Sequence, residues 1–441
     1  MENNKNILLI SNFEKTYYYH KIFDKFCDSK NIFWYVVNKK NYEFLKKFYN
    51  FDNIAYVNKK NISKTDIKNE IKEDIKLNEI LYADRAIKIN NYNQLYLKKL
   101  EIFTHKFLKD NNIKFIFGEF TWSYELVISR VANLLDIPYY NMQSSRYPSN
   151  RFLFFSNEKQ NLFYLRNNNI ENINKIEDEN KYEIYIKKKN KDKKDIKKII
   201  KKSFKLLFDD YYDRYDPTLI SKSRRIKNFI FKFINKIGYD FLPKIKREKL
   251  ETKKYIIYFL QKSPESTVDV KGMYYSDQVN NIVNIWKILP SNFKLIVKEH
   301  PNCVGERSIF FYKKFLKLNN IYLIDLKSIE ENEQFIKHSL ATFSIASTAS
   351  LQSAIKEINS FTFADTFFNS LKFSHKLRLE DLRNSFNLNN LIEKKHKEKN
   401  INDNDYSKNS FEGYIIDEYL DDENNIKKIR VALKEVINNK N

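Results

Sequence analysis

The chain has 441 residues, of which 42% are hydrophobic and 16% aromatic, so it is long enough for about two domains and too apolar to be a disordered protein. Its formal net charge of +23 bears first on solubility and nonspecific association. The sequence has no zinc-finger spacing, RNA-recognition motif or basic zipper, so we expect no nucleic-acid partner.

Short apolar runs alternate with longer periodic segments over residues 1–173. Each run is expected to form a strand and each periodic segment a helix of about 10 to 15 residues. The expected elements include strands at Ile7 to Ile10, Ile32 to Val37, Lys114 to Phe117 and Pro138 to Asn141, and a helix over Trp122 to Leu135. This alternation predicts βαβ units and a parallel sheet, so we assign residues 1–173 to an N-terminal Rossmann-like domain.

A carboxylate follows the strand Lys114 to Phe117. Ligands bind outside the carboxyl ends of strands in open α/β sheets, so Glu119 is a candidate general base or nucleophile. Glu125 lies inside the next expected helix and ranks below Glu119. Arg146 and Arg151 lie in the loop expected after the next strand and are candidates to clamp a carboxylate. Surface ion pairs are the alternative for both arginines.

Residues 174–254 are expected to be a basic helical linker or insertion. Lys187 to Lys205 contains 11 lysines against Asp192 and Asp195, and the apolar residues of this region fall on one helical face. One interpretation is an interdomain helix with a solvated lysine face. The other is docking on an anionic membrane surface, where each lysine contributes ~1 kcal/mol.

The strand and helix alternation restarts in residues 255–400, where a polar cluster follows each of three expected strands. Gln261 and Glu265 follow Tyr255 to Leu260, and Ser347 and Thr348 follow Leu340 to Ile345. Lys298, Glu299, His300 and Pro301 follow Phe293 to Val297, which places a histidine at a strand end. Three strand ends therefore point at one crevice.

These three clusters suit an anionic ligand. An imidazole held by a following proline can donate to a phosphate or ribose oxygen, and the helix expected after Ser347 and Thr348 presents an N-terminus that binds phosphate. Ordinary helix capping explains the Ser347 turn equally well. Gln261 and Glu265 could contact a base or ribose, although Glu265 could equally begin the next helix.

The remaining features concern the C-terminal segment, compartment and metals. Residues 401–441 are expected to be a polar tail followed by a closing helix, because Ile426, Ile429, Leu433 and Val436 fall on one helical face. Two cysteines, Cys27 and Cys303, suggest neither a disulfide framework nor a zinc site, and favour a reducing cytoplasm. No Asp-x-Asp cluster follows a strand, so no metal is expected, and five glycines form no phosphate-binding loop.

An ordered series of residues in the second half resembles the capsule polysaccharide biosynthesis family, whose members include retaining β-Kdo transferases. The series is Leu260-Gln261, Pro264-Glu265, Gly272, Tyr275, Asp277-Gln278, Leu289-Pro290, Val297-Lys298-Glu299-His300-Pro301, Gly305, Arg307 and Tyr312. The resemblance extends from about Tyr255 to Phe368. It departs from the family at Ser347-Thr348, Gln352-Ser353 and Glu357-Ile358-Asn359, where a Gly-Thr turn, a Glu-Ala pair and a Gly-Lys-Pro are usual.

The resemblance implies a GT-B fold, in which two Rossmann-like parallel-sheet domains face a central cleft. Residues 1–173 would form the acceptor side, and residues 255–400 would bind a nucleotide sugar, which is a substrate, so no cofactor is expected. Glu119 and His300 would be catalytic, and Arg146 and Arg151 would bind the acceptor or the sugar carboxylate. The nucleotide would contact Gln261, Glu265, Lys298, Glu299, His300, Pro301, Ser347 and Thr348.

The expected function is therefore metal-independent glycosyl transfer in capsule or lipopolysaccharide biosynthesis. The donor would be Kdo or a related acidic sugar linked to CMP, and the acceptor a glycan or glycolipid. The enzyme would be cytoplasmic, and peripheral at the inner membrane if Lys187 to Lys205 docks there. Alternatives are a CDP-polyol phosphotransferase-like enzyme, a catalytically silent nucleotide-binding assembly protein, and a nucleic-acid or membrane-surface binder that uses the lysine-rich segment.

Overall fold

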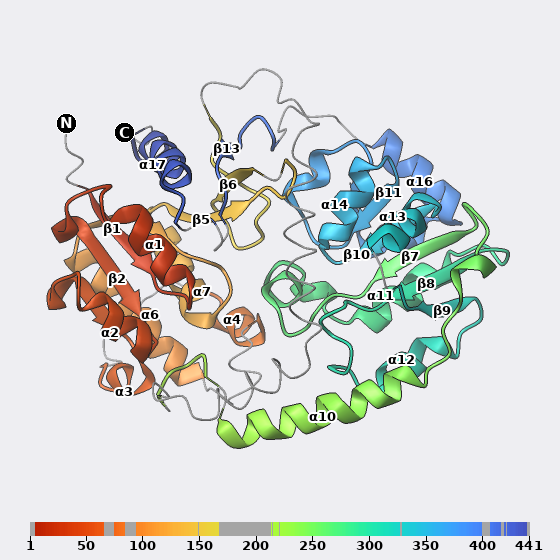
Figure 1. The fold of residues 1–441 in the computed structure, drawn as a ribbon, viewed down its shortest axis with the longest axis horizontal. Coiled ribbons are helices and arrows are strands. Elements are labelled where there is room, and N and C mark those ends of the chain that lie inside the picture. Colours follow the sequence, from red (N-terminus) through yellow and green to blue (C-terminus); the bar gives the residue numbers. More distant parts are fainter. Residues whose placement is uncertain are drawn as a thin grey trace. The chain divides into compact units, whose positions relative to one another are not determined.

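The computed structural model describes residues 5–65, 75–83, 94–148, 150–166, 213, 215–219, 221–326, 329–398, 406–415, 419 and 421–438. The chain divides into two compact units. Unit 1 comprises Met1–Glu158, Leu162–Lys222 and Tyr406–Asn441, and unit 2 comprises Lys159–Asn161 and Ser223–Asp405. Each unit contains one mainly parallel sheet and several helices (Figure 1). The α/β class and the two Rossmann-like sheets expected from the sequence are confirmed.

The sheet of unit 1 has seven strands in the order β13-β6-β5-β4-β1-β2-β3. The strands are β1 (Asn6–Ile10), β2 (Ile32–Val36), β3 (Ile54–Tyr56), β4 (Ile113–Phe117), β5 (Tyr139–Ser144), β6 (Arg151–Phe155) and β13 (Phe411–Glu412). The first five are parallel, whereas β6 and β13 are antiparallel to their neighbours. The order of the parallel strands is that of a Rossmann fold, and it reverses between β1 and β4.

The helices of unit 1 connect these strands and close the unit. They are α1 (Lys15–Phe23), α2 (Lys39–Leu45), α3 (Lys59–Ile62), α4 (Leu77–Ala83), α6 (Gln94–Asp110), α7 (Ser123–Leu134) and α17 (Glu423–Asn438), with short 3-10 turns at Ser29–Asn31 and Phe51–Asn53. Helix α17 packs its apolar face on the core of β1 and α1, where Ile426, Ile429, Leu433 and Val436 are buried. Arg430 ties it there, because its Nε donates a 2.8 Å hydrogen bond to the carbonyl of Ile22.

The sheet of unit 2 has six parallel strands in the order β12-β11-β10-β7-β8-β9. The strands are β7 (Tyr255–Phe259), β8 (Lys294–Lys298), β9 (Ile321–Ile324), β10 (Ala341–Ser344), β11 (Asn359–Thr362) and β12 (Ser374–Lys376). Counted along the chain, this is the complete Rossmann order 3-2-1-4-5-6. The order reverses between β7 and β10, so a ligand site is expected where these two strands end.

Both faces of this sheet are buried. In β7, Ile256 and Tyr258 enter one hydrophobic cluster, while Tyr255, Ile257 and Phe259 enter another on the opposite face. This is why β7 is a continuous apolar run rather than an alternating one. The helices of unit 2 are α10 (Lys222–Asp240), α11 (Gln278–Lys287), α12 (Ile309–Leu316), α13 (Ile329–Lys337), α14 (Thr348–Ile355), α15 (Leu379–Asn384) and α16 (Leu388–Lys397), with short turns at Arg247–Lys249, Thr267–Lys271, Met273–Tyr275 and Phe367–Ser370.

Two local expectations differ from the structure or fall outside it. Arg151 does not lie in a loop but begins β6, because residues 151–155 pair with β5 and with β13 from the end of the chain. From Ser223 onward, the expected linker belongs to unit 2 and contains α10. Lys187 to Lys205 lies outside the described residues. In the described parts of the chain, no helix is long and apolar enough to cross a bilayer.

Candidate functional site

Gln261 joins the ends of β7 and β10, where the strand order of unit 2 reverses. Its backbone is fixed by Gln278, whose Oε1 accepts from the Gln261 amide and whose Nε2 donates to the Gln261 carbonyl, both at 2.8 Å. Its side-chain Oε1 accepts a 2.6 Å hydrogen bond from the amide of Ala346. The buried amide side chain therefore holds the turn after β10 against the end of β7.

The turn after β10 is held by hydroxyl groups. Ser344 Oγ lies 2.7 Å from Ser350 Oγ and accepts a 3.0 Å hydrogen bond from the Ser347 amide. Ser347 Oγ accepts from the Ala349 amide at 3.1 Å, so Ser347 is the N-cap of α14, and Thr348 is the first helical residue. Ser347 therefore caps the helix, as the second interpretation of this turn predicts. The N-terminus of α14, which is the positive end of its dipole, lies beside Gln261.

His300 lies at the end of the neighbouring strand, β8, as its position in the sequence predicts. Its amide donates to Glu299 Oε1 at 2.7 Å, and its Nδ1 accepts from the Asn302 amide at 3.2 Å. Burial lowers the pKa of His300, against the opposing charges of Glu265 and Glu299. The neutral ring with Nδ1 as acceptor carries its proton on Nε2, which makes Nε2 a hydrogen-bond donor.

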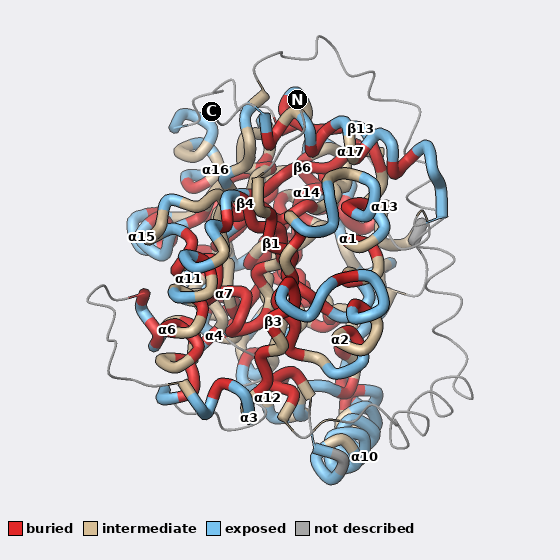
Figure 2. Tube along the Cα trace, turned by 90° about the vertical axis from the view of Figure 1, so that its left-hand side faces the viewer, coloured by how far each residue is buried: buried red, intermediate tan, exposed pale blue. Residues whose placement is uncertain are grey.

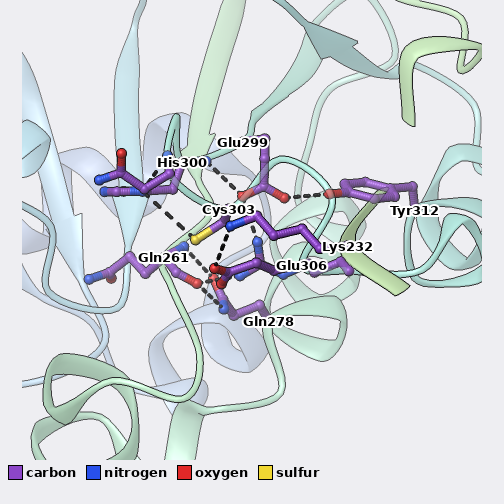
Figure 3. Close-up of polar contacts among 10 residues, drawn as sticks. Lys232, Gln261, Gln278, Glu299, His300, Cys303, Glu306 and Tyr312 are labelled. Carbon is purple, nitrogen blue, oxygen red and sulfur yellow. Dashed lines mark hydrogen bonds and ion pairs between the residues drawn. The ribbon is translucent and has the colours of Figure 1, made fainter. Parts of the chain in front are cut away.

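Glu299 is directed into unit 2 rather than toward a ligand. Its Oε1 is 2.5 Å from Arg307 Nη1, and its Oε2 accepts a 2.6 Å hydrogen bond from Tyr312 Oη (Figure 3). Arg307 Nη2 also donates to the carbonyl of Gln261. The carboxylate of Glu299 is thus bound within unit 2, where it positions the loop that carries His300, and contact of Glu299 with a nucleotide stays a prediction. Arg307 and Tyr312 occur in the family-like series but were not among the expected site residues.

Three other residues that were expected to contact the nucleotide are Lys298, Glu265 and Pro301. Lys298 ends β8, and burial lowers its pKa to about 8, against the opposing charge of Asp325. The charges of Lys298, Lys262 and Glu265 all act on His300. The Glu265 amide donates to Asp269 Oδ2 at 2.6 Å, and Pro301 is exposed.

A cysteine also lies next to the histidine. Cys303 Sγ is 3.8 Å from His300 Nδ1 (Figure 3). Burial raises the pKa of the Cys303 thiol to about 12, so it is protonated at neutral pH. A thiol in that state is not an activated nucleophile, and the pair does not form a Cys-His catalytic dyad.

Unit 1 has a second polar cluster at its own strand-order reversal. Asn12 follows β1, and its Nδ2 donates to Glu119 Oε2 at 3.0 Å and to Glu125 Oε1 at 2.8 Å. Asn12 therefore joins the end of β1 to the residues after β4, much as Gln261 joins β7 to β10. Sequence reasoning did not identify Asn12, because neither its neighbours nor its spacing distinguish it.

The two carboxylates of this cluster have different surroundings. Glu125 is buried and accepts backbone hydrogen bonds from Thr121 and Trp122 at 2.8 and 3.0 Å. Burial, and then the charge of Glu119, raise the pKa of Glu125 to about 8. The Glu119 side chain is 20% exposed and forms an ion pair with Lys15. Glu119 is therefore accessible to a ligand. Glu125 is buried and positions Asn12, which in turn donates a hydrogen bond to Glu119.

The two candidate arginines of unit 1 differ. Arg146 lies in the loop after β5, where its amide donates to Ser144 Oγ at 3.1 Å. Arg151 is buried, and its guanidinium donates to the Ser410 hydroxyl and carbonyl at 2.6 and 2.5 Å. Arg151 thus fastens β6 to the C-terminal segment, and its role as a carboxylate clamp stays a prediction. Among the described residues, no group of three His, Cys, Asp or Glu side chains has the arrangement of a metal site.

No protein-family model matches the chain, and no curated protein matches it. Similar solved structures include a UDP-GlcNAc 2-epimerase from Methanocaldococcus jannaschii, 13% identical over 90% of this chain and 93% of that one, with a TM-score of 0.27. Two β-Kdo transferases of KpsC from Thermosulfurimonas dismutans are also similar.

The 2,7 transferase is 10% identical over 75% of this chain and 89% of its own, with a TM-score of 0.34. The 2,4 transferase is 9% identical over 64% and 78%, with a TM-score of 0.33.

Proposed function

We propose that the chain is a glycosyltransferase that binds a nucleotide-activated sugar at the β7–β10 edge of unit 2. The hydrogen bond from the Ala346 amide to Gln261 Oε1 carries this proposal, because it fixes a polar turn and a helix N-terminus at the strand-order reversal. Ligands of Rossmann-type sheets bind at that position, and an anion is favoured by the helix N-terminus.

The groups around this edge suit the phosphate of a nucleotide. His300 would donate from Nε2 to a phosphate oxygen and stabilise the charge that develops on the leaving group. Lys298, whose pKa burial lowers to about 8, would gain its proton fully as the phosphate approaches. The hydrogen bond from neutral His300, the charge of Lys298 and the helix N-terminus would together stabilise the departing nucleotide, so no metal is proposed.

Unit 1 would supply the chemistry on the acceptor side. Of the two carboxylates that Asn12 contacts, Glu119 is the accessible one, and Asn12 holds it at 3.0 Å. We assign Glu119 to the removal of a proton from the acceptor hydroxyl or to attack at the reacting carbon. Glu125 positions Asn12 and therefore Glu119. Arg146 is the candidate for binding the carboxylate of an acidic sugar or acceptor.

The finer assignment is a CMP-linked acidic sugar, such as Kdo, transferred to a glycan or glycolipid of capsule or lipopolysaccharide. It rests on the likeness of residues 255–368 to the capsule polysaccharide family. A CDP-polyol phosphotransferase is the second candidate, although the turn from Phe343 to Thr348 lacks the acidic residue that such enzymes would be expected to carry. A silent nucleotide-binding protein is the third, because Gln352 stands where a glutamate is usual.

A thermal-shift titration of the full chain with CMP, CDP, UDP and GDP tests the proposal, since a ligand that binds only the folded state raises the melting temperature. We expect CMP to stabilise the protein and His300→Ala to abolish this effect. His338→Ala, at another half-buried histidine of unit 2, should keep it. No response to any nucleotide contradicts the proposed site, and a preference for UDP or GDP contradicts the donor.

Transfer itself needs a second measurement. Release of the nucleotide from a CMP-sugar in the presence of a glycan acceptor should be lost in Glu119→Gln, while the thermal shift with CMP should remain. An unaltered protein that binds CMP but releases none from any donor would support the silent-protein alternative.

A further inference from the structure

Helix α10 of unit 2 turns an apolar face outward. Ile226, Phe229, Ile230, Phe233, Ile234 and Ile237 recur at the spacing of a single helical face. These six side chains are between 44% and 62% exposed. Phe241 extends the same face, because its amide donates to the Ile237 carbonyl and its side chain is 83% exposed. The tube in Figure 2 shows α10 as a mostly exposed element.

The opposite side of α10 is the side that packs on unit 2. Tyr239 is buried against Tyr312, with ring centroids 5.1 Å apart. Gly305 has a φ of +87° and lies so close to the Lys232 carbonyl that a side chain would not fit there. Lys232 Nζ is 3.2 Å from Glu306 Oε1. The helix is thus docked through a largely polar face.

This arrangement is the reverse of that of an ordinary amphipathic helix, which buries its apolar face in the core. The outward face therefore needs an occupant other than unit 2, since contiguous exposed apolar surface of this kind marks an interaction site. The charges of the helix indicate which occupant. Lys222–Asp240 contains six basic residues and one acidic residue.

Two of the basic residues, Lys227 and Lys236, border the apolar face. At 3.6 residues per turn, Lys227 and Lys236 lie about a quarter turn to either side of the face centre. Cations in these positions let their aliphatic stems lie along an apolar surface while the ammonium groups reach anionic headgroups. An apolar face with a cationic border is typical of helices that lie in the plane of a membrane interface.

We propose that α10 is an interfacial helix that docks unit 2 on an anionic bilayer surface. The apolar side chains would enter the boundary between headgroups and acyl chains, and the bordering lysines would contact anionic lipids. Lys227 and Lys236 lie about two and a half turns apart along the helix, so a helix lying flat on the bilayer would bring both lysines to anionic headgroups. A second copy of the chain suits this surface poorly, because two cationic borders would repel each other.

The proposed membrane contact lies on α10, whose packing on unit 2 is described above. The contact expected from the sequence was the segment Lys187 to Lys205, which lies outside the described residues. The contact through α10 does not rest on the proposed glycosyl transfer. A protein at the bilayer surface would nonetheless meet lipid-linked acceptors at high local concentration.

Flotation of the full chain with vesicles tests the proposal. Vesicles of phosphatidylcholine with about 30% phosphatidylglycerol should bind the protein, and phosphatidylcholine alone should bind it about tenfold less. Phe229→Ser/Phe233→Ser should lower binding to the anionic vesicles about tenfold. Phe386→Ser is the matched control, because Phe386 is another exposed phenylalanine of unit 2, at 93%. This variant should bind the anionic vesicles as the unaltered protein does.

A second variant locates the helix directly. Phe233→Trp should shift its fluorescence to shorter wavelength when anionic vesicles are added, whereas Phe386→Trp should not. Absence of binding to anionic vesicles overturns the proposal, and so does equal binding by the double serine variant. A dimer in solution that the double serine variant abolishes would also overturn it, because it would identify a second copy as the occupant.

Discussion

Tyr312 donates a 2.6 Å hydrogen bond to Glu299, and both groups are enclosed in unit 2. Removing the hydroxyl leaves a buried carboxylate with one fewer donor, which costs about 1–3 kcal/mol. We therefore expect Tyr312→Phe to lower the free energy of unfolding by this amount in urea unfolding followed by circular dichroism. Tyr274→Phe, at a tyrosine that is 76% exposed, should have little effect. Equal stability of the two variants would show that the Glu299 carboxylate is satisfied without Tyr312.

Gly272 lies against the turn that Gln261 holds. A Cβ on Gly272 would overlap Ile345 Cγ2, and Ile345 directly precedes Ala346. We expect Gly272→Ala to lower stability by about 1–3 kcal/mol through overpacking and to reduce the thermal shift produced by CMP. Gly238→Ala is the control, because its Cβ would meet Ile309 at an ordinary 3.5 Å. Gly238 lies within helix α10, where alanine is favoured over glycine, so Gly238→Ala should stabilise the protein by about 0.5–1 kcal/mol and leave nucleotide binding unchanged.

Glu125 predicts a dependence of stability on pH. Burial raises the pKa of Glu125 from 4.5 to about 8 in the folded protein, so the folded state binds more protons than the unfolded state between these values. The contribution of Glu125 to the free energy of unfolding is fully present below pH 4.5. It is lost as pH rises toward 8, at up to about 1.4 kcal/mol per pH unit. Glu125→Gln should flatten this slope in urea unfolding measured from pH 5 to 8.5.

The control for Glu125 is Glu43→Gln, at a position on the solvent side of α2 with an ion pair to Lys46. It should preserve the slope of the unaltered protein. A slope that survives in Glu125→Gln would assign the proton to another group of unit 1.

Lys298 predicts that nucleotide binding takes up a proton. Burial lowers the pKa of Lys298 from 10.5 to about 8, so about half of the side chains are neutral at pH 8 and about three quarters at pH 8.5. A bound phosphate would raise this pKa and draw a proton from the buffer. Calorimetric titration with CMP at about pH 8.5, in two buffers of different ionisation enthalpy, should report uptake of up to about 0.8 proton.

Lys298→Met should abolish this uptake, and Lys287→Met, at an exposed position of α11, should not. Binding without proton uptake in the unaltered protein would place Lys298 outside the phosphate site.

The sequence predicted several of the strands that are continuous apolar runs. Both β7 and β8 were located in this way, because burial on two faces removes polar residues from them. Strand β11 escaped notice because Ser360 and Thr362 are buried in it, so it lacks an apolar pattern. Strand β6 was placed in a loop because its first residue, Arg151, is buried only with the help of Ser410, 259 positions away.

The candidate site was predictable to a similar extent. Positions after strand ends identified Gln261, His300 and Ser347, because the parallel strands β7, β8 and β10 are adjacent in the sheet and end at the same edge. The sequence did not distinguish the direction of Glu299, which depends on Arg307 and Tyr312 in the next helix region. Nor did it indicate Asn12, whose partners lie more than 100 positions away. Contacts of this kind are set by the fold and not by local patterns.

The loop between β8 and α12 has two attachments with different consequences. Near its start, His300 lies at the proposed phosphate site, and near its end Gly305 and Glu306 contact α10. If a headgroup and a sugar donor each favour one arrangement of this short stretch, they are thermodynamically linked. The factor by which lipid changes donor affinity must then equal the factor by which donor changes lipid affinity. An enzyme with positive coupling of this kind would bind its donor more tightly at the membrane, where lipid-linked acceptors are present, than in solution.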